Sequence, residues 1–241
     1  MRAVLLLVRR ELSALLNTPW GWVILAFVLL IDGLLFNVFA MGGREKYSAD
    51  VLSEFFYFSS GTTMIAGILL TMRLIAEERQ TGTIVILQTA PISEWGVVLG
   101  KFLGAWSFLA IITLLTAYMP ALIFVNGKLS LAQIGTGYLG LLSLGAATVA
   151  IGTFASAISK NQLLAAVLGT GMLVLMLLGW MLGQVTHPPV SEIFSYSALW
   201  DRHFQHFQDG RINTESLVFF ASVTAGFLLL ATRALQIRRW R

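Results

Sequence analysis

Residues 20–40 read WGWVILAFVLLIDGLLFNVFA, and Asp32 is the one charged side chain among them. A helix needs about 20 mostly apolar residues to cross the hydrocarbon core of a bilayer. Five further stretches have this length and character, at residues 57–75, 97–125, 131–157, 163–184 and 216–234. The pattern predicts an all-α membrane protein with six transmembrane helices.

The composition of the whole chain favours the same class. Of 241 residues, 57% are hydrophobic and only 12% are charged, whereas charged residues make up about 25% of a soluble domain. A lipid solvent removes the need for a charged outer surface. We therefore expect residues 1–241 to form a single transmembrane domain. The chain has no cysteine, which excludes disulfides and zinc sites with thiolate ligands.

The distribution of basic residues predicts an orientation. With the N-terminus in the cytoplasm, 11 of the 16 Lys and Arg residues fall on the cytoplasmic side, as the positive-inside rule requires. Both termini are then cytoplasmic. No run of like charges provides the footprint of a nucleic-acid-binding protein, so we expect no nucleic acid as a partner.

Residues 1–19 precede the first span and have a helical pattern of their own. Apolar side chains recur on one helical face, at Leu5, Val8, Leu12 and Leu15. This spacing predicts an amphipathic helix that lies flat on the membrane interface, in contact with lipid. The alternative is a basic orientation signal without a fixed structure. Further along, Gly96, Gly100 and Gly104 repeat every four residues, a spacing that lets helix backbones approach closely in lipid.

The segment with the most functional information is the predicted cytoplasmic loop at residues 76–95. Residues 77–93 read EERQTGTIVILQTAPIS. Acidic residues stand at the membrane exit, Gly82 permits a turn, and the apolar run that follows is too short to span a bilayer. Pro91 ends the run, and Ser93 can cap the next helix three residues before Gly96. The pattern predicts a short helix that docks on a partner; the alternative is an amphipathic connection that binds nothing.

This loop resembles the signature of type 2 ABC exporter permeases. In that family a Glu-rich exit is followed by Gly-Thr, an apolar run, Pro-x-Ser and a Lys one turn into the next span. The resemblance covers the whole chain, and it implies that the short helix is a coupling helix, which fits a cleft on an ATP-binding subunit. The implied ATPase-coupling residues are Glu77, Glu78, Gly82, Thr83, Ile84, Leu87, Pro91, Ser93 and Lys101.

The outer segment at residues 185–215 and the end of the chain resemble one branch of these permeases. Residues 203–212, HFQHFQDGRI, followed by a span that closes on Arg238-Arg239-Trp240, are similar to the gliding-motility-type (GldF-like) branch. That branch usually has Arg before the glycine, where this sequence has Asp209.

The resemblance implies a function. The chain would be the permease subunit of an ABC transporter in a bacterial cytoplasmic membrane, working as a dimer with itself or with a related permease. ATP and magnesium would belong to the partner subunit, and this chain would bind no cofactor. The alternatives are an ATP-driven assembly or motility component that acts on an outer-face protein without carrying cargo, and a membrane enzyme.

No motif in the sequence supports the enzyme alternative. Residues 96–102, GVVLGKF, lack the spacing and the Ser or Thr of a phosphate-binding loop. Glu77 and Glu78 resemble the paired glutamates of a membrane protease family, but Gly82 stands where that family expects Arg. We therefore expect no catalytic residue.

Two further features stay open. His203 and His206 are three residues apart, with His187 and Asp201 in the same segment; this spacing suits a metal site, but an interfacial outer helix explains the alternating aromatic residues more simply, so we expect no metal. Asp32 lies inside the first span, where a charge is costly. It is either a polar contact on the substrate pathway or a buried hydrogen-bonding or protonated group.

Overall fold

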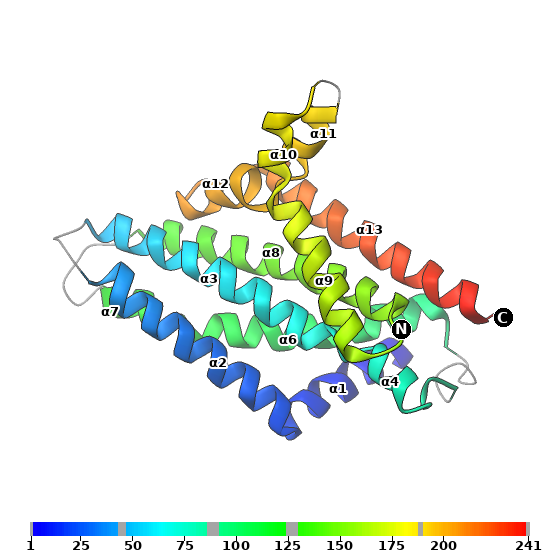
Figure 1. The fold of residues 1–241 in the computed structure, drawn as a ribbon. Helices are drawn as coiled ribbons and strands as arrows, with labels where there is room; N and C mark the ends of the chain where they lie inside the picture. Colours follow the sequence, from blue (N-terminus) through cyan, green and yellow to red (C-terminus); the bar gives the residue numbers. More distant parts are fainter. Residues whose placement is uncertain (1, 43–46, 86–91, 124–129, 188–189, 240–241) are drawn as a thin grey trace.

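The computed structural model describes residues 2–42, 47–85, 92–123, 130–187 and 190–239. Within these residues the chain is helical, with no strand. The long helices form a bundle, and Figure 1 shows their arrangement. In chain order the elements are α1 (Arg2–Asn17), α2 (Pro19–Leu35), η1 (Phe36–Ala40), α3 (Ser48–Thr71), α4 (Ala76–Gln80), α6 (Glu94–Leu115), α7 (Tyr118–Ile123), α8 (Leu131–Ile158), α9 (Gln162–Leu177), α10 (Gly179–Val185), α11 (Val190–Tyr196), η2 (Leu199–Phe204), α12 (Gln205–Gln208) and α13 (Thr214–Arg239).

Five helical stretches are long and apolar enough to cross a membrane. They are Pro19–Phe39, Ser48–Gln80, Glu94–Ile123, Leu131–Ile158 and Thr214–Ile237. A sixth is obtained if α9 and α10 are counted as one span. The predicted all-α membrane protein is therefore confirmed with five or six candidate spans.

The expected span at 163–184 differs from a straight helix, because α9 and α10 meet at a bend of 51°. Beyond the bend, α10 packs closely against α11. A Cβ atom on Gly179 would lie 2.7 Å from the Phe194 carbonyl oxygen, and one on Gly183 would meet the Ser195 side chain. Hydropathy is summed along the sequence and does not detect such a change of direction.

The central helix is α8, most of which is buried. Small residues allow its neighbours to approach: a Cβ atom on Gly67 of α3 would lie 2.8 Å from the Thr148 side chain. Threonine hydroxyls in the bundle donate to their own helix backbone, as Thr148 does to Leu144 at 2.9 Å and Thr153 to Val149 at 2.7 Å. Such bonds satisfy polar groups where no water is present.

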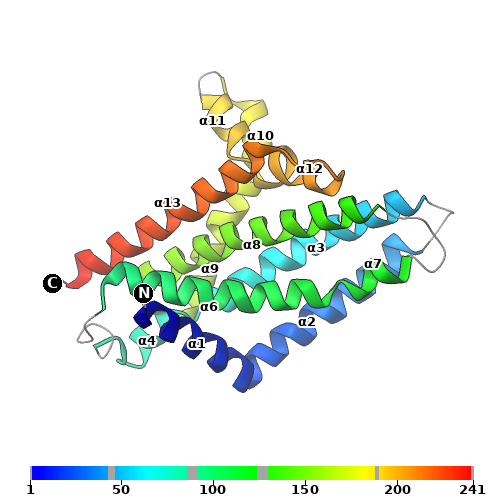
Figure 2. The same ribbon diagram turned by 180° about the vertical axis from the view of Figure 1, so that it is seen from behind.

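Both termini lie at one end of the bundle, here called the termini end (Figures 1 and 2). The opposite end, where α3 and α8 begin, is called the far end. The α10–α11 hairpin projects beyond the long helices in both views.

Helix α1 lies at the termini end and packs along α6. Leu7 is buried in this contact, and a Cβ atom on Gly100 would lie 2.7 Å from the Leu7 Cβ atom. The side chain of Leu5 is 72% exposed and that of Leu16 is 40% exposed. The face of α1 that packs on α6 is thus rotated from the predicted apolar face, which included Leu5. Helix α1 packs on protein with one face and exposes apolar side chains on another.

Candidate functional site

The predicted coupling loop begins at the termini end, where α3 passes through a turn into the short helix α4. The start of α4 is held by α8: the backbone N–H groups of Ile75 and Ala76 both donate to Ser156 Oγ at 3.0 Å. Arg79 Nη1 donates to the Ser159 carbonyl oxygen at 2.7 Å. These bonds fasten α4 to the C-terminal end of α8.

The turn after α4 requires a glycine. Gly82 has φ of +75°, a left-handed conformation that other residues adopt at a cost. Thr83, which follows, is exposed, while Ile84 is half-buried against the core. Two predicted coupling residues, Leu87 and Pro91, lie outside the described residues. Ser93 Oγ accepts from the Gly96 backbone N–H at 3.2 Å, which is the predicted cap at the start of α6.

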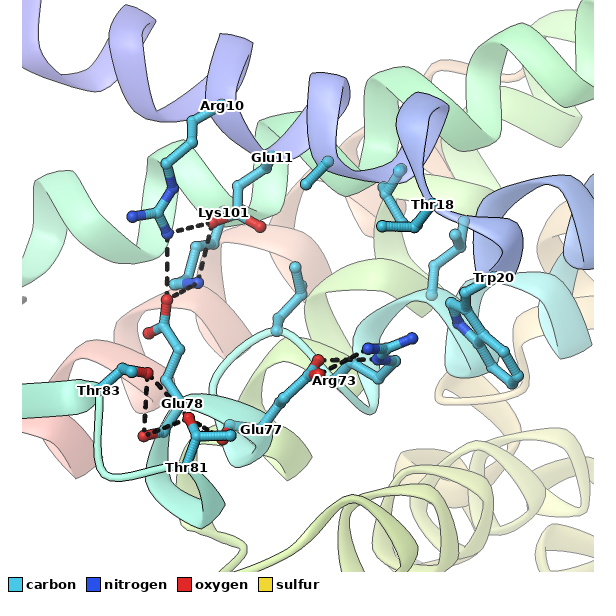
Figure 3. Close-up of a pocket in the computed structure, with 14 residues that line it drawn as sticks. Arg10, Glu11, Thr18, Trp20, Arg73, Glu77, Glu78, Thr81, Thr83 and Lys101 are labelled. Atoms are coloured by element: carbon cyan, nitrogen blue, oxygen red, sulfur yellow. Dashed lines mark hydrogen bonds and ion pairs between the residues drawn. The ribbon is translucent and has the colours of Figure 1, made fainter.

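The strongest feature of the site is an ion-pair network around Lys101 (Figure 3). Lys101 comes from α6 and is 1% exposed. Its Nζ donates to Glu78 Oε1 at 2.8 Å and to Glu11 Oε1 at 3.0 Å. Arg10 Nη2 donates to the same two oxygens, at 3.1 Å for Glu78 and 2.7 Å for Glu11. Four side chains from α1, α4 and α6 therefore meet at one point.

The pairing favours the charged forms of Glu11 and Arg10. Burial of Glu11 acts to raise its pKa, but the positive charges of Lys101 and Arg10 outweigh burial and keep the pKa below the ordinary value of 4.5. Partial burial acts to lower the pKa of Arg10, yet Glu11 and Glu78 raise it overall. A buried ion pair adds little net stability, but loss of one partner leaves the other charge uncompensated. The network thus fixes the position of α4 relative to α1 and α6.

A second ion pair lies beside the first. Arg73 near the end of α3 donates to Glu77 through Nε at 2.7 Å and Nη2 at 2.5 Å. The Arg73 guanidinium also lies over the ring of Trp20, 5.6 Å from its centroid. The two predicted coupling glutamates, Glu77 and Glu78, therefore have partners within this chain instead of presenting free carboxylates to another subunit.

A cavity of about 310 Å³ separates these ion pairs. Arg10, Arg73 and Lys101 balance Glu11, Glu77 and Glu78 around it (Figure 3). The lining includes no histidine or cysteine. What this arrangement provides is a mechanical connection between helices.

Several residues of the site were not predicted from the sequence: Arg10, Glu11, Arg73 and Ser156. One signal could have found Glu11. A lysine inside a span needs a carboxylate partner, and Glu11 is the only acidic residue before Asp32. Ser156 gave no signal, because a serine in a span most often bonds to its own helix.

The other candidates from the sequence lie elsewhere. Asp32 is buried in α2, 3% exposed, and accepts from Thr62 Oγ1 at 2.6 Å. His203 is 1% exposed, its Nε2 lies 3.0 Å from the Tyr196 carbonyl oxygen, and its ring stacks on Phe219 at 3.8 Å. Burial lowers the pKa of His203 below 6.5. Within the described residues, no three His, Asp or Glu side chains are grouped closely enough to hold a metal ion.

Comparison with known proteins identifies a family for the chain, although no curated protein matches it. The family model described as ABC-2 family transporter protein matches residues 5–232, from α1 into α13. The match includes the complete Lys101 network and confirms the resemblance at the level of the family. Permeases of this family are membrane components of transporters that normally work with an ATP-binding subunit. This chain belongs to the ABC-2 transporter family.

Proposed function

We propose that this chain is the permease subunit of an ATP-driven ABC transporter, and that an ATP-binding subunit docks on the loop at residues 76–95. The observation that supports this most is the Lys101 network, which joins α4, α1 and α6 beside the loop that the resemblance implies is the coupling segment. ATP and magnesium belong to the docked subunit, and no bond chemistry occurs in this chain.

The geometry suggests how force would pass into the bundle. A displacement of α4 acts on α8 through Ser156 and Ser159. It acts on α6 through Glu78 and Lys101, and from there on α1 through Glu11. Because α4, at the end of the stretch Ser48–Gln80, is linked to two other candidate spans, its movement is transmitted to them, and two rigid helices that shift together can open or close a pathway.

The proposal includes an orientation and a second permease. The termini end faces the cytoplasm of a bacterial cell, as the distribution of Lys and Arg predicts, and the substrate crosses the cytoplasmic membrane toward the far end. The pathway forms between this chain and a second permease, either a copy or a related chain. The proposal also places the chain in the gliding-motility-type branch of the family, which its outer segment resembles.

A second candidate function is an ATP-driven assembly or motility component that acts on an outer-face partner without carrying cargo. The α10–α11 hairpin favours it, because it stands out to the side of the long helices and offers a surface to such a partner (Figure 1). A docked ATP-binding subunit is common to both functions.

The test is purification of the tagged full-length chain from its native host in mild detergent, with mass spectrometry and an ATPase assay. We expect an ATP-binding subunit to copurify with the native chain and to be lost with Leu87→Asp, which places a charge in the docking segment. Leu131→Asp, at an exposed leucine that begins α8 at the far end, is the matched control and should retain the subunit.

The comparison is made on preparations that elute as single symmetric peaks in size exclusion. Absence of any ATP-binding subunit from the native preparation would contradict the proposed function. Retention of the subunit by Leu87→Asp would show that the docking surface is not at residues 76–95, and equal loss from both variants would contradict a specific role of that loop.

A further inference from the structure

Asp32 is a carboxyl group inside the bundle that the coupling network does not use. It follows Pro19 by 13 positions in α2, which at 1.5 Å per residue places it about 20 Å along the helix. The hydrocarbon core is about 30 Å thick, so Asp32 lies within it. Val28 and Phe36, one turn before and after, are buried on the same side. Asp32 therefore faces protein and not lipid.

The hydrogen bonds of Asp32 come from α3. Thr62 Oγ1 lies 2.6 Å from Asp32 Oδ1 and 3.1 Å from the Ser59 carbonyl oxygen. Since a hydroxyl has one proton, Thr62 cannot donate fully to both acceptors. The Ser59 hydroxyl is close to Asp32 and buried, but it has no hydrogen-bond partner of acceptable geometry. An ionised carboxylate would accept about four hydrogen bonds, which is more than these hydroxyl groups supply.

No positive charge compensates Asp32 in the described part of the chain. Asp32 takes part in none of the ion pairs formed there by Arg10, Arg73, Lys101 and Arg202. Two tyrosines lie near it. Tyr138 of α8 is within electrostatic range and shares a hydrogen bond of 3.1 Å with Thr116, and the Tyr118 hydroxyl of α7 lies beside Gly33. Neither tyrosine supplies a cation.

An unpaired carboxylate in this setting is far less stable than a neutral carboxyl group, which binds a proton instead of remaining ionised. A proton also completes the hydrogen bonds. The Asp32 O–H group can donate to a hydroxyl of α3, either that of Thr62 or the unpartnered one of Ser59. If Thr62 accepts this bond, its own hydroxyl is free to donate to the Ser59 carbonyl oxygen.

We propose that Asp32, Thr62 and Ser59 form a proton-binding site inside the membrane, at the contact between α2 and α3. The proton is bound while these helices are packed as they are here. When α2 moves away from α3 and water enters, the carboxyl group ionises and releases the proton. Packing of α2 on α3 is therefore linked to proton uptake, and this link exists whether or not an ATP-binding subunit docks at α4.

The experiment is infrared spectroscopy of the purified full-length chain in lipid nanodiscs, titrated through neutral pH. We expect the native chain to retain the carbonyl band of a protonated carboxyl group at pH 7, where exposed carboxyl groups are ionised. Asp32→Asn should abolish that band, and Asp32→Glu should keep a band at a shifted frequency. Asp50→Asn, which removes an exposed carboxyl group from the first turn of α3, is the matched control and should leave the band unchanged.

Asp32→Asn has the shape of the protonated acid, so we expect it to fold. If it does not fold, Asp32→Glu, which keeps the carboxyl group, assigns the band by its shift in frequency. Absence of a protonated carboxyl band at pH 7 would overturn the proposal. A band that disappears on addition of sodium chloride at constant pH would also overturn it, because the site would then bind a metal cation in place of the proton.

Discussion

Lys101 is a charged side chain with 1% exposure, and at the residue scale its replacement has the clearest expected effect. Lys101→Met removes the shared partner of Glu11 and Glu78 and leaves the two carboxylates facing each other with Arg10 alone. Removal of one partner from a buried ion pair costs about 3–5 kcal/mol. We expect the free energy of unfolding to fall by about 3 kcal/mol, the lower end of this range, because Arg10 still pairs with both carboxylates.

Arg10→Gln is the matched control for this change. It removes a cation from the same network, but the Arg10 side chain is 55% exposed, and exposed ion pairs contribute about 0–1 kcal/mol. Unfolding of both variants would be followed by circular dichroism in one detergent. Equal losses for Lys101→Met and Arg10→Gln would mean that burial of Lys101 does not determine the strength of the network.

The sequence indicated part of this site. The resemblance selected Glu77, Glu78 and Lys101, and the structure places Lys101 and Glu78 in direct contact. The need of a buried lysine for a carboxylate could have pointed to Glu11 and the resemblance pointed to Glu78, but the sequence did not show that the two glutamates share one lysine. They are far apart in the sequence, and only the packing of α1 on α6 brings them together.

Helix α1 on α6 is the contact to test at the element scale. A Cβ atom on Gly104 would lie 2.6 Å from the Glu11 Cβ atom and 3.4 Å from the Val8 carbonyl oxygen. Gly104→Ala therefore pushes α1 away from α6, and overpacking of this kind costs about 1–3 kcal/mol. We expect a lower midpoint of thermal unfolding.

Gly61→Ala in α3 is the control, because no heavy atom lies within 4 Å of its added Cβ atom. Alanine in an open helical position is favoured over glycine by about 0.5–1 kcal/mol, so this variant should match the native chain or exceed its stability. If Gly104→Ala were as stable as Gly61→Ala, α1 would not be packed as described.

Glycine spacing predicted close packing at Gly96, Gly100 and Gly104, and the structure identifies α1 as the neighbouring helix. A repeat of small residues marks a face of a helix but does not specify what covers it. The same limit applies to Gly179 and Gly183, which are also four residues apart: the bend of 51° and the α10–α11 contact depend on tertiary structure.

For the whole molecule, the apolar stretches of the sequence were sufficient to predict an all-helical membrane protein, because spanning helices must satisfy their own backbone hydrogen bonds. The same stretches do not report orientation in the bilayer, which was inferred from Lys and Arg alone. The central position of α8 also gave no signal, since its residues are as apolar as those of the spans that surround it.

Site-specific cross-linking in membranes of the native host tests the proposed docking most directly, and a chain without cysteine is well suited to it. Single cysteines would be placed at Thr83, exposed after α4, and at Tyr47, which is 83% exposed at the far end. Each would be treated with a membrane-permeant cross-linker that joins a thiol to a nearby amine. We predict that Thr83→Cys forms an adduct containing an ATP-binding subunit and that Tyr47→Cys does not. An adduct with that subunit from Tyr47→Cys, or none from Thr83→Cys, would contradict docking on the loop at residues 76–95.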